Sequence, residues 1–389
     1  MMQSVRTTAA GNLESLLLCA QTHVDSATSK QILELAATEP DWDSILKAAS
    51  EHSLTPIFCR NIEEYGGEAL PSSLRRCFSE EFLRNSCRNL ALTAELFRVV
   101  EALESHGVCA TPYKGPVLGA QAYGDAAMRQ FSDLDIIVPQ LQIVAAHDAL
   151  LARGFRPVIS GVEPQAGGRQ VPGQYAYRTD AETLVELHTE LTLRYFPCRP
   201  DLTELCERRE FVQVAGRAVL TFSPEDTLLL LCVHGSKHFW ERLGWIADIA
   251  ALSTASRPVD WGMAMERARE WGIRRMVLLG AGLAERLFQT PLPNGVADQL
   301  RSDATARGLI DGICRRIFAP KPVELGVFSR FAFRVRMRGP LAQGLPYAVR
   351  LALMPTEFDR GRHAPYLEPL YALLRPLRLA RSYGWRTRG

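Results

Sequence analysis

Residues 131–138 read Phe-Ser-Asp-Leu-Asp-Ile-Ile-Val and are followed by a proline, a composition that predicts a short buried β-strand. Successive side chains of a strand point to opposite faces, so Asp133 and Asp135 share one face. Leu134 and Ile136 then point the other way, into the core. Two carboxylates this close repel each other unless a cation lies between them, and Mg²⁺ prefers such oxygen ligands. D-x-D is a common pattern, and an acidic pair exposed at a strand end is the alternative interpretation.

The sequence before this strand predicts a turn that can bind phosphate. Residues 108–113 (Val-Cys-Ala-Thr-Pro-Tyr) form a β-type run that ends at Lys114-Gly115, and a helix is expected over 117–123. Backbone N–H groups at such a turn, together with the N-terminus of the helix, can hold phosphate. Four residues of this segment are therefore candidates for nucleotide and phosphate binding: Lys114, Gly115, Arg129 and Ser132.

A third carboxylate comes from a second apolar segment, Leu-Val-Glu-Leu-His at 184–188. Together with residues 175–178 it predicts a hairpin. Glu186 shares its face with Leu184 and His188, and burying a glutamate beside aliphatic neighbours costs several kcal/mol unless it has a partner.

A metal ion would supply that partner. Asp133, Asp135 and Glu186 are therefore the candidate catalytic residues and metal ligands. Glu182 and Glu190 compete with Glu186 for the third position, but Glu182 fits the turn of the hairpin and Glu190 the frayed end of the strand.

Four blocks of sequence together resemble a known protein family. They are Tyr-Lys-Gly-Pro-Val-Leu at 113–118, Arg-Gln-Phe-Ser-Asp-Leu-Asp-Ile-Ile-Val at 129–138, Val-Glu-Leu-His at 185–188, and Leu-Cys-Val-His-Gly-Ser-Lys-His-Phe-Trp-Glu-Arg-Leu at 231–243 with Trp245 and Asp248. In combination, over residues 40–255, they resemble a bacterial family of uncharacterised nucleotidyltransferases in the DNA polymerase β-like superfamily. One departure is the turn Lys114-Gly115-Pro116, where better-known members of the superfamily carry a Gly-Ser or Gly-Gly pair.

The resemblance implies an α+β fold, in which a polymerase β-like nucleotidyltransferase core with a small mixed sheet lies between helical N-terminal and C-terminal regions. It also implies metal-dependent transfer of an NMP group from an NTP, such as ATP, to a hydroxyl or phosphate acceptor with release of pyrophosphate. Two Mg²⁺ or Mn²⁺ ions are the implied cofactors. The acceptor stays open among a sugar, another small molecule, a peptide and an RNA end. Two other functions also stay open: a metal-dependent phosphohydrolase and a catalytically inactive nucleotide-binding protein.

Changes in sequence periodicity divide the chain into three regions. Residues 1–92 are expected to be helical, residues 93–222 to form the nucleotidyltransferase core, and residues 223–389 to be helical again. The last region begins with Ser-Pro-Glu-Asp at 223–226, which predicts a helix start because serine caps a helix and proline suits its first position. A second hairpin is expected within residues 211–221.

Two weaker patterns lie after the predicted core. His234 and His238 lie one helical turn apart, with Lys237 between them. This spacing can bind zinc, but no suitable third ligand is adjacent. The favoured interpretation is that Lys237 and His238 contact phosphate or substrate, and a solvated helix face is the alternative. His188 and His234 are further candidates for the site. Gly-Ala-Gly at 280–282 lacks the third glycine and the strand of a dinucleotide fingerprint.

Composition excludes several classes of protein. The chain has 389 residues, of which 47% are hydrophobic and 23% charged, and no apolar stretch long enough to span a membrane. Its nine cysteines include no C-x-x-C pair, which argues against a zinc ribbon and favours a reduced, cytoplasmic protein.

Charge is distributed unevenly along the chain. The net charge is only +2, yet residues 321–389 contain 13 basic and 4 acidic residues, with Tyr371, Tyr383 and Trp385 interleaved. Such a segment is compatible with nucleic acid, with a membrane surface or with a solvated helix.

Overall fold

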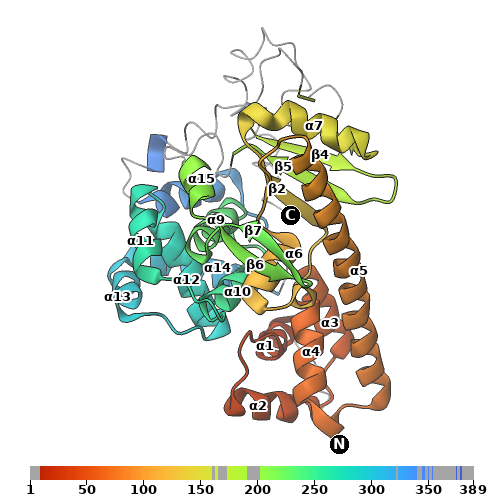
Figure 1. Ribbon diagram of the computed structural model, residues 1–389. Helices are drawn as coiled ribbons and strands as arrows, with labels where there is room; N and C mark the ends of the chain where they lie inside the picture. Colours follow the sequence, from red (N-terminus) through yellow and green to blue (C-terminus); the bar gives the residue numbers. More distant parts are fainter. Residues whose placement is uncertain are drawn as a thin grey trace, which may run out of the picture.

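The computed structural model shows a mixed α+β fold with a small mixed sheet, as the resemblance implies (Figure 1). The described residues are 9–159, 163–164, 173–190, 202–320 and 323–339, with a few more at 344–346, 349, 353, 374 and 377–378. Tyr371, Tyr383 and Trp385 lie outside them. The binding role of the arginine-rich segment therefore stays a prediction.

Helices occupy the chain before the sheet. They are α1 Ala9–Cys19, α2 Ser26–Ala36, α3 Trp42–Glu51, α4 Thr55–Tyr65, the 3₁₀ turn η1 Gly67–Ala69, and α5 Ser72–Ser105. Aspartates cap two of them: Asp25 accepts a hydrogen bond from the backbone N–H of Thr28 before α2, and Asp41 accepts one from Ser44 before α3. α5 is continuous across residues 92 and 93, so the expected boundary between the first two regions falls inside a helix.

The core contains the strands and short helices of the middle region. They are β1 Thr111–Pro112, α6 Gly115–Tyr123, η2 Ala126–Met128, β2 Asp133–Ile137, η3 Gln140–Gln142, α7 Ile143–Ala152, β3 Arg156–Pro157, β4 Gln174–Arg178, β5 Leu184–His188, α8 Leu202–Glu207, β6 Glu210–Val214 and β7 Arg217–Thr221. Both expected hairpins, β4–β5 and β6–β7, are confirmed. The first strand is shorter than the expected 108–113. β1 is an edge strand, and Pro112 cannot donate a hydrogen bond to the ladder.

The five-stranded sheet has the order β1-β2-β5-β4-β3, in which β2 and β5 are parallel and the other pairs antiparallel. One face is apolar and packs with α5 and α7, as in Figure 1; it includes Leu134, Ile136, Val185 and Leu187. The opposite face carries the acidic side chains. The alternation predicted from the sequence for β2 and β5 is therefore confirmed.

Helices again occupy the chain after the sheet. They are α9 Pro224–Lys237, α10 Leu243–Ser253, α11 Trp261–Glu270, α12 Arg274–Phe288, α13 Asn294–Ser302, α14 Ala304–Ile317 and α15 Val327–Arg338. Ser223 caps α9 as predicted, because its hydroxyl accepts a hydrogen bond from the backbone N–H of Asp226 at 3.2 Å. None of the helices in the described ranges combines the length and the apolar character that a membrane span requires.

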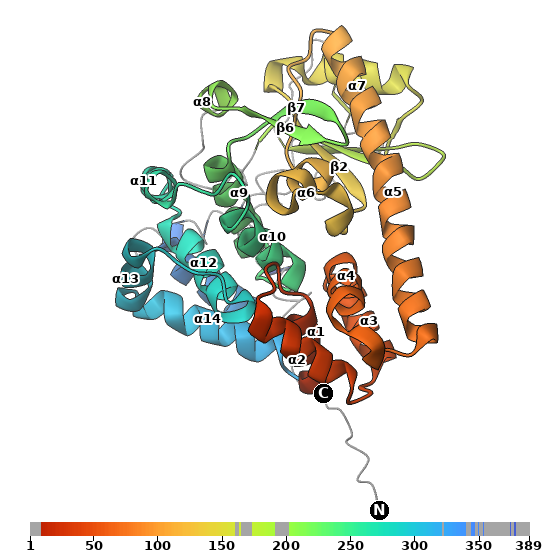
Figure 2. The same cartoon turned by 60° about the horizontal axis from the view of Figure 1, so that its bottom comes forward.

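Two hydrophobic clusters hold these parts together. The smaller one lies between the sheet, α5 and α7. The larger one combines apolar residues of α1–α4 with those of α9–α14, so the N-terminal and C-terminal helices share one core. Figure 2 shows α1 close to α12, where the side-chain amide of Gln21 donates to the carbonyl oxygen of Leu287 at 3.3 Å. This shared core fixes the N-terminal helices against those that line the site described below.

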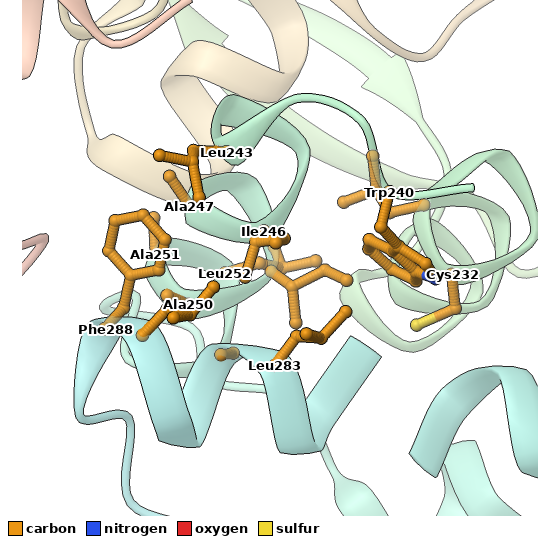
Figure 3. Packing of buried hydrophobic residues seen from close by; sticks show 14 of the residues in the cluster. Cys232, Trp240, Leu243, Ile246, Ala247, Ala250, Ala251, Leu252, Leu283 and Phe288 are labelled. Carbon is orange, nitrogen blue, oxygen red and sulfur yellow. The ribbon is translucent and has the colours of Figure 1, made fainter. Parts of the chain in front are cut away.

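Gly280 and Gly282 lie inside α12 at close helix contacts. A Cβ atom at Gly280 would lie 2.7 Å from Sγ of Cys232 and 2.8 Å from Cδ1 of Ile249. Figure 3 shows Cys232 and Trp240 packed in this cluster. These glycines serve packing between α12 and its neighbours, in agreement with the absence of a dinucleotide fingerprint.

The substitution Gly280→Ala should therefore destabilise the protein. We expect the free energy of unfolding, measured by urea denaturation, to fall by about 1–3 kcal/mol because the added methyl overpacks the core. Gly308→Ala is the matched control: Gly308 is exposed on α14 and a Cβ there meets no atom within 4 Å. It should be neutral or stabilise by about 0.5–1 kcal/mol. Equal effects at the two positions would contradict this account of α12.

Candidate active site

Asp135 is the central acidic residue of the polar sheet face. Its carboxylate is 4% exposed and accepts a hydrogen bond from Nζ of Lys114 at 3.1 Å. It also accepts one at 2.8 Å from Nε2 of His188 on β5. In the parallel pairing of β2 and β5, Asp135 lies opposite Glu186, whose Oε2 is 3.5 Å from the same His188 nitrogen. Four functional side chains thus meet around one strand pair.

The two aspartates of β2 are in different electrostatic environments. Burial alone raises the pKa of Asp135, but the Lys114 ammonium and the hydrogen bond from His188 outweigh it and hold this pKa well below its usual range. For Asp133, burial and then repulsion from Asp135 and Glu186 raise the pKa. Asp135 is therefore a stabilised anion, whereas at Asp133 the opposing effect of Lys114 and Arg129 is smaller than that of burial and the neighbouring acids.

Within the described ranges, one group of side chains is arranged to hold a metal ion: Asp135, Glu186 and His188, whose ligand atoms lie within 4.8 Å of one another. The sequence predicted Asp133 in place of His188. The difference follows from strand geometry: neighbouring strands are about 4.8 Å apart, whereas residues i and i+2 of one strand are about 6.6 Å apart. Glu186 therefore comes nearer to Asp135 than Asp133 does. Two carboxylates and an imidazole whose ligand atoms lie this close together can coordinate a divalent cation.

A polar cavity of about 620 Å³ opens beside this group. The sheet region, α5, the turn between α3 and α4, and the segment from α9 to α10 all contribute to its wall: Ser50, Glu51, Ser53, Arg88, Lys114, Arg129, Gln130, Phe131, Ser132, Asp133, Asp135, His234, His238, Glu241, Arg242, Gly244, Trp245 and Asp248. Five of these residues are acidic and four are basic. The wall therefore carries charges of both signs in nearly equal number.

Arg129 is held in this wall from two sides. Its Nε donates to both carboxylate oxygens of Asp248 on α10, at 3.0 and 3.2 Å, and Tyr123 donates to the same carboxylate at 3.0 Å. Its backbone carbonyl accepts hydrogen bonds from the side-chain amides of Asn89 and Asn85 on α5, at 2.6 and 3.4 Å. Residues from α5, α6 and α10 thus fix the guanidinium at the cavity, where its side chain is 13% exposed.

The histidines of α9 form an uncharged aromatic part of the wall. The ring centroids of His234 and His238 lie 5.1 and 5.3 Å from that of Trp245. Burial lowers the pKa of His238 to about 4, and burial with repulsion from Lys114 lowers the pKa of His234 well below its usual range. Both rings are neutral near pH 7, so they offer hydrogen bonds and ring contacts but no positive charge.

The model of a family described as uncharacterised nucleotidyltransferases matches residues 38–289. The chain belongs to this family. The match covers all the strands of the described residues and the whole wall of the polar cavity. A search of curated proteins gives no match.

Two solved structures each match about half of this chain. The antibiotic-resistance factor ANT(2'')-Ia is 16% identical, with 56% of this chain and 97% of that chain covered and a TM-score of 0.27. An antigenic nucleotidyltransferase-like protein from Paracoccidioides brasiliensis is 18% identical, with 54% and 95% covered and a TM-score of 0.30.

The nucleotidyltransferase fold brings most of the predicted site residues together. The residues in the cavity wall are Lys114, Arg129, Ser132, Asp133, Asp135, His234 and His238, and Glu186 and His188 adjoin Asp135. Among the described residues, four candidates do not line this cavity: Glu186 and His188, which adjoin Asp135, and also Lys237 and Gly115. Lys237 lies beside His238 without reaching the wall, and Gly115 is buried in the first turn of α6. Gly115 is needed there for another reason: its φ is +53°, and a Cβ would lie 3.3 Å from the carbonyl oxygen of Asp133.

Several residues of the cavity wall were not among the predicted site residues, and three of them are Arg88, Arg242 and Asp248. Arg88 lies on the long helix α5, and nothing in the sequence around it distinguishes it from other surface arginines. Arg242, directly before α10, belongs to the fourth matching block but was not singled out. Asp248 belongs to the fourth matching block, but only the structure pairs it with Arg129.

Proposed function

We propose that this chain transfers the NMP group of an NTP to an acceptor hydroxyl and releases pyrophosphate. The observation that carries the proposal is the Asp135 cluster at the edge of a polar cavity, in which Lys114, Glu186 and His188 surround one buried carboxylate. The family match supports the reaction class.

Asp133, Asp135 and Glu186 would hold two Mg²⁺ or Mn²⁺ ions. When bound, such ions offset phosphate charge and lower the pKa of an acceptor hydroxyl. Mg²⁺ prefers oxygen to imidazole nitrogen, so we assign His188 to orienting Asp135 through its 2.8 Å hydrogen bond.

The basic side chains of the cavity hold the phosphates. Lys114 and Arg129 are 15% and 13% exposed, and each is already anchored by an aspartate. Anchored donors need little rearrangement when the negative charge of the reaction develops, which is the condition for strong electrostatic stabilisation. Glu186, half-buried beside Asp135, is placed to take the proton of the acceptor hydroxyl.

Labelled nucleotides distinguish the three functions that the sequence left open. The protein is incubated with Mg²⁺ or Mn²⁺, a small-molecule cell extract, and an NTP labelled at the α- or the γ-phosphate. We expect the α-label to move into a new adduct and the γ-label into pyrophosphate. Release of labelled nucleotide without an adduct would identify a phosphohydrolase, and NTP binding without turnover would identify an inactive nucleotide-binding protein.

Asp248 should contribute to NTP binding through Arg129. We expect Asp248→Asn to raise the KM for NTP about tenfold, a cost of about 1.4 kcal/mol, because the guanidinium loses its charged anchor. The control is a double-mutant cycle with Arg129→Met. If Asp248 acts through Arg129, Asp248→Asn should change the KM little once Arg129 is gone. Additive effects on KM would contradict this role.

We also propose a cytoplasmic, reducing location for the chain. The described cysteines are all free, and Cys19, Cys59 and Cys232 among them are buried. A free buried thiol is typical of proteins that work in a reducing compartment.

A further inference from the structure

A second, apolar pocket lies on the same sheet face as the acids. It has a volume of about 230 Å³, and its wall comes from β3, β4, β5 and the residues just after β3: Pro157, Val158, Ile159, Glu163, Gln174, Tyr175, Ala176, Tyr177, Arg178, Leu184 and Glu186. Glu186 is thus a wall residue of this pocket as well as a member of the Asp135 cluster. The proposed function leaves this pocket without a role.

Strand pairing places the pocket on the far side of Glu186 from the polar cavity. Asp135 on β2 lies opposite Glu186 on β5, and Glu186 lies opposite Ala176 on β4. These three residues form a row across adjacent strands, which Figure 1 shows side by side. The row begins in the wall of the polar cavity and ends in the apolar pocket. The small side chain of Ala176 leaves the floor of the pocket open.

The two cavities differ in what they can bind. The polar cavity has four basic residues in its wall, whereas the apolar pocket has one, Arg178, which is paired with Glu182 at 2.8 Å. Glu163 and Glu186 in the pocket wall repel phosphate. Val158 and Ile159 are 47% and 40% exposed there, although burial of such side chains is favourable. The apolar pocket therefore fits an uncharged, apolar group.

We propose that this pocket binds an apolar group of the acceptor and holds the acceptor hydroxyl at Glu186. The inference rests on the proposed function and names its acceptor class: an alcohol or phenol that carries an aliphatic or aromatic group. Pockets that bind drug-sized ligands have volumes of about 300–1,000 Å³, so this pocket of about 230 Å³ accommodates only part of an acceptor, such as one aromatic ring.

One bond forms and one bond breaks when the NMP group is transferred to the acceptor. The acceptor oxygen forms a bond to the α-phosphorus, and the bond from that phosphorus to the oxygen bridging to the β-phosphate breaks. The electron pair leaves with pyrophosphate, and the hydroxyl proton passes to the carboxylate of Glu186. In-line displacement requires the acceptor oxygen and the leaving pyrophosphate to lie on opposite sides of the α-phosphorus, and an acceptor held at Glu186 approaches from the side of the apolar pocket.

Binding of 4-fluorobenzyl alcohol, followed by ¹⁹F NMR, tests the pocket independently of turnover. We expect the wild type to bind this probe and Ala176→Leu, which fills the floor, to weaken it at least about fivefold. Val158→Ser should also weaken it, and because Val158 is half exposed this variant puts folding at little risk. Ala218→Leu makes the same change at an exposed position of β7 and should leave the probe affinity unchanged. The affinity for Mg²⁺–NTP should be the same in all four proteins.

Transfer with simple acceptors provides the second measurement. With α-labelled NTP, benzyl alcohol should be a better acceptor than glycerol by about tenfold in kcat/KM, and Ala176→Leu should remove this preference. Two results would overturn the inference in a protein that still binds NTP. One is an unchanged probe affinity in both pocket variants, and the other is labelling of an RNA end at the same rate in the wild type and in both pocket variants. A wild type that binds no NTP would overturn the proposed function, and the inference with it.

Discussion

Asp135→Asn should reduce nucleotidyl transfer by about a thousandfold or more, because Asp135 is the carboxylate on which Lys114, His188 and the implied cations converge. It should also lower the free energy of unfolding in the absence of metal, by about 3 kcal/mol. The change leaves the Lys114 ammonium without its charged partner in a buried position. Steady-state kinetics and urea denaturation measure the two effects.

Asp133→Asn is the comparison for this prediction. It should also reduce transfer, but it should keep or raise the stability of the metal-free protein, because burial and neighbouring acids raise the pKa of Asp133. A carboxyl group whose pKa is higher in the folded protein than in the unfolded chain destabilises the folded protein at pH values above the pKa of the unfolded chain. The stability gain of Asp133→Asn should therefore appear as the pH rises above about 4 and vanish below it. Equal stability changes in the two variants would contradict the difference between the aspartates.

Glu186→Gln should cut the rate of transfer by about two to four powers of ten, since the amide keeps the volume of the side chain but neither accepts the proton nor carries charge. Single-turnover kinetics with α-labelled NTP would measure the loss. Glu190→Gln, two residues beyond β5, is the matched control and should have little effect. A larger loss of rate in Glu190→Gln than in Glu186→Gln would identify Glu190 as the third carboxylate of the site.

The local features of this fold were predictable from the sequence. Alternation along β2 put Asp133 and Asp135 on one face, the Ser223 cap located the start of α9, and the turn after Arg178 predicted the β4–β5 hairpin. Each of these depends on residues close together in the chain. The choice of Glu186 over Glu182 rested on the same reasoning, and the register with Asp135 agrees with it.

The features that were not predictable depend on contacts between distant segments. The sequence treats Asp133 and Asp135 as equivalent, and only the approach of Lys114 and His188 distinguishes them. The pairing of Arg129 with Asp248 joins residues 119 positions apart. The sequence also failed to predict which basic residues line the cavity. Helix packing brings Arg88 into the cavity wall, although it was not predicted there, and keeps Lys237 out of the wall, although it was.

The central claim is that the acids of β2 and β5 hold divalent cations beside a bound NTP. Electron paramagnetic resonance of Mn²⁺ with a non-hydrolysable NTP analogue tests it most directly, with wild type, Asp135→Asn and the Glu190→Gln control compared. The account predicts that wild type and Glu190→Gln bind Mn²⁺ together with the analogue and that Asp135→Asn binds it at least about tenfold more weakly. Equal Mn²⁺ affinity in all three proteins would contradict it.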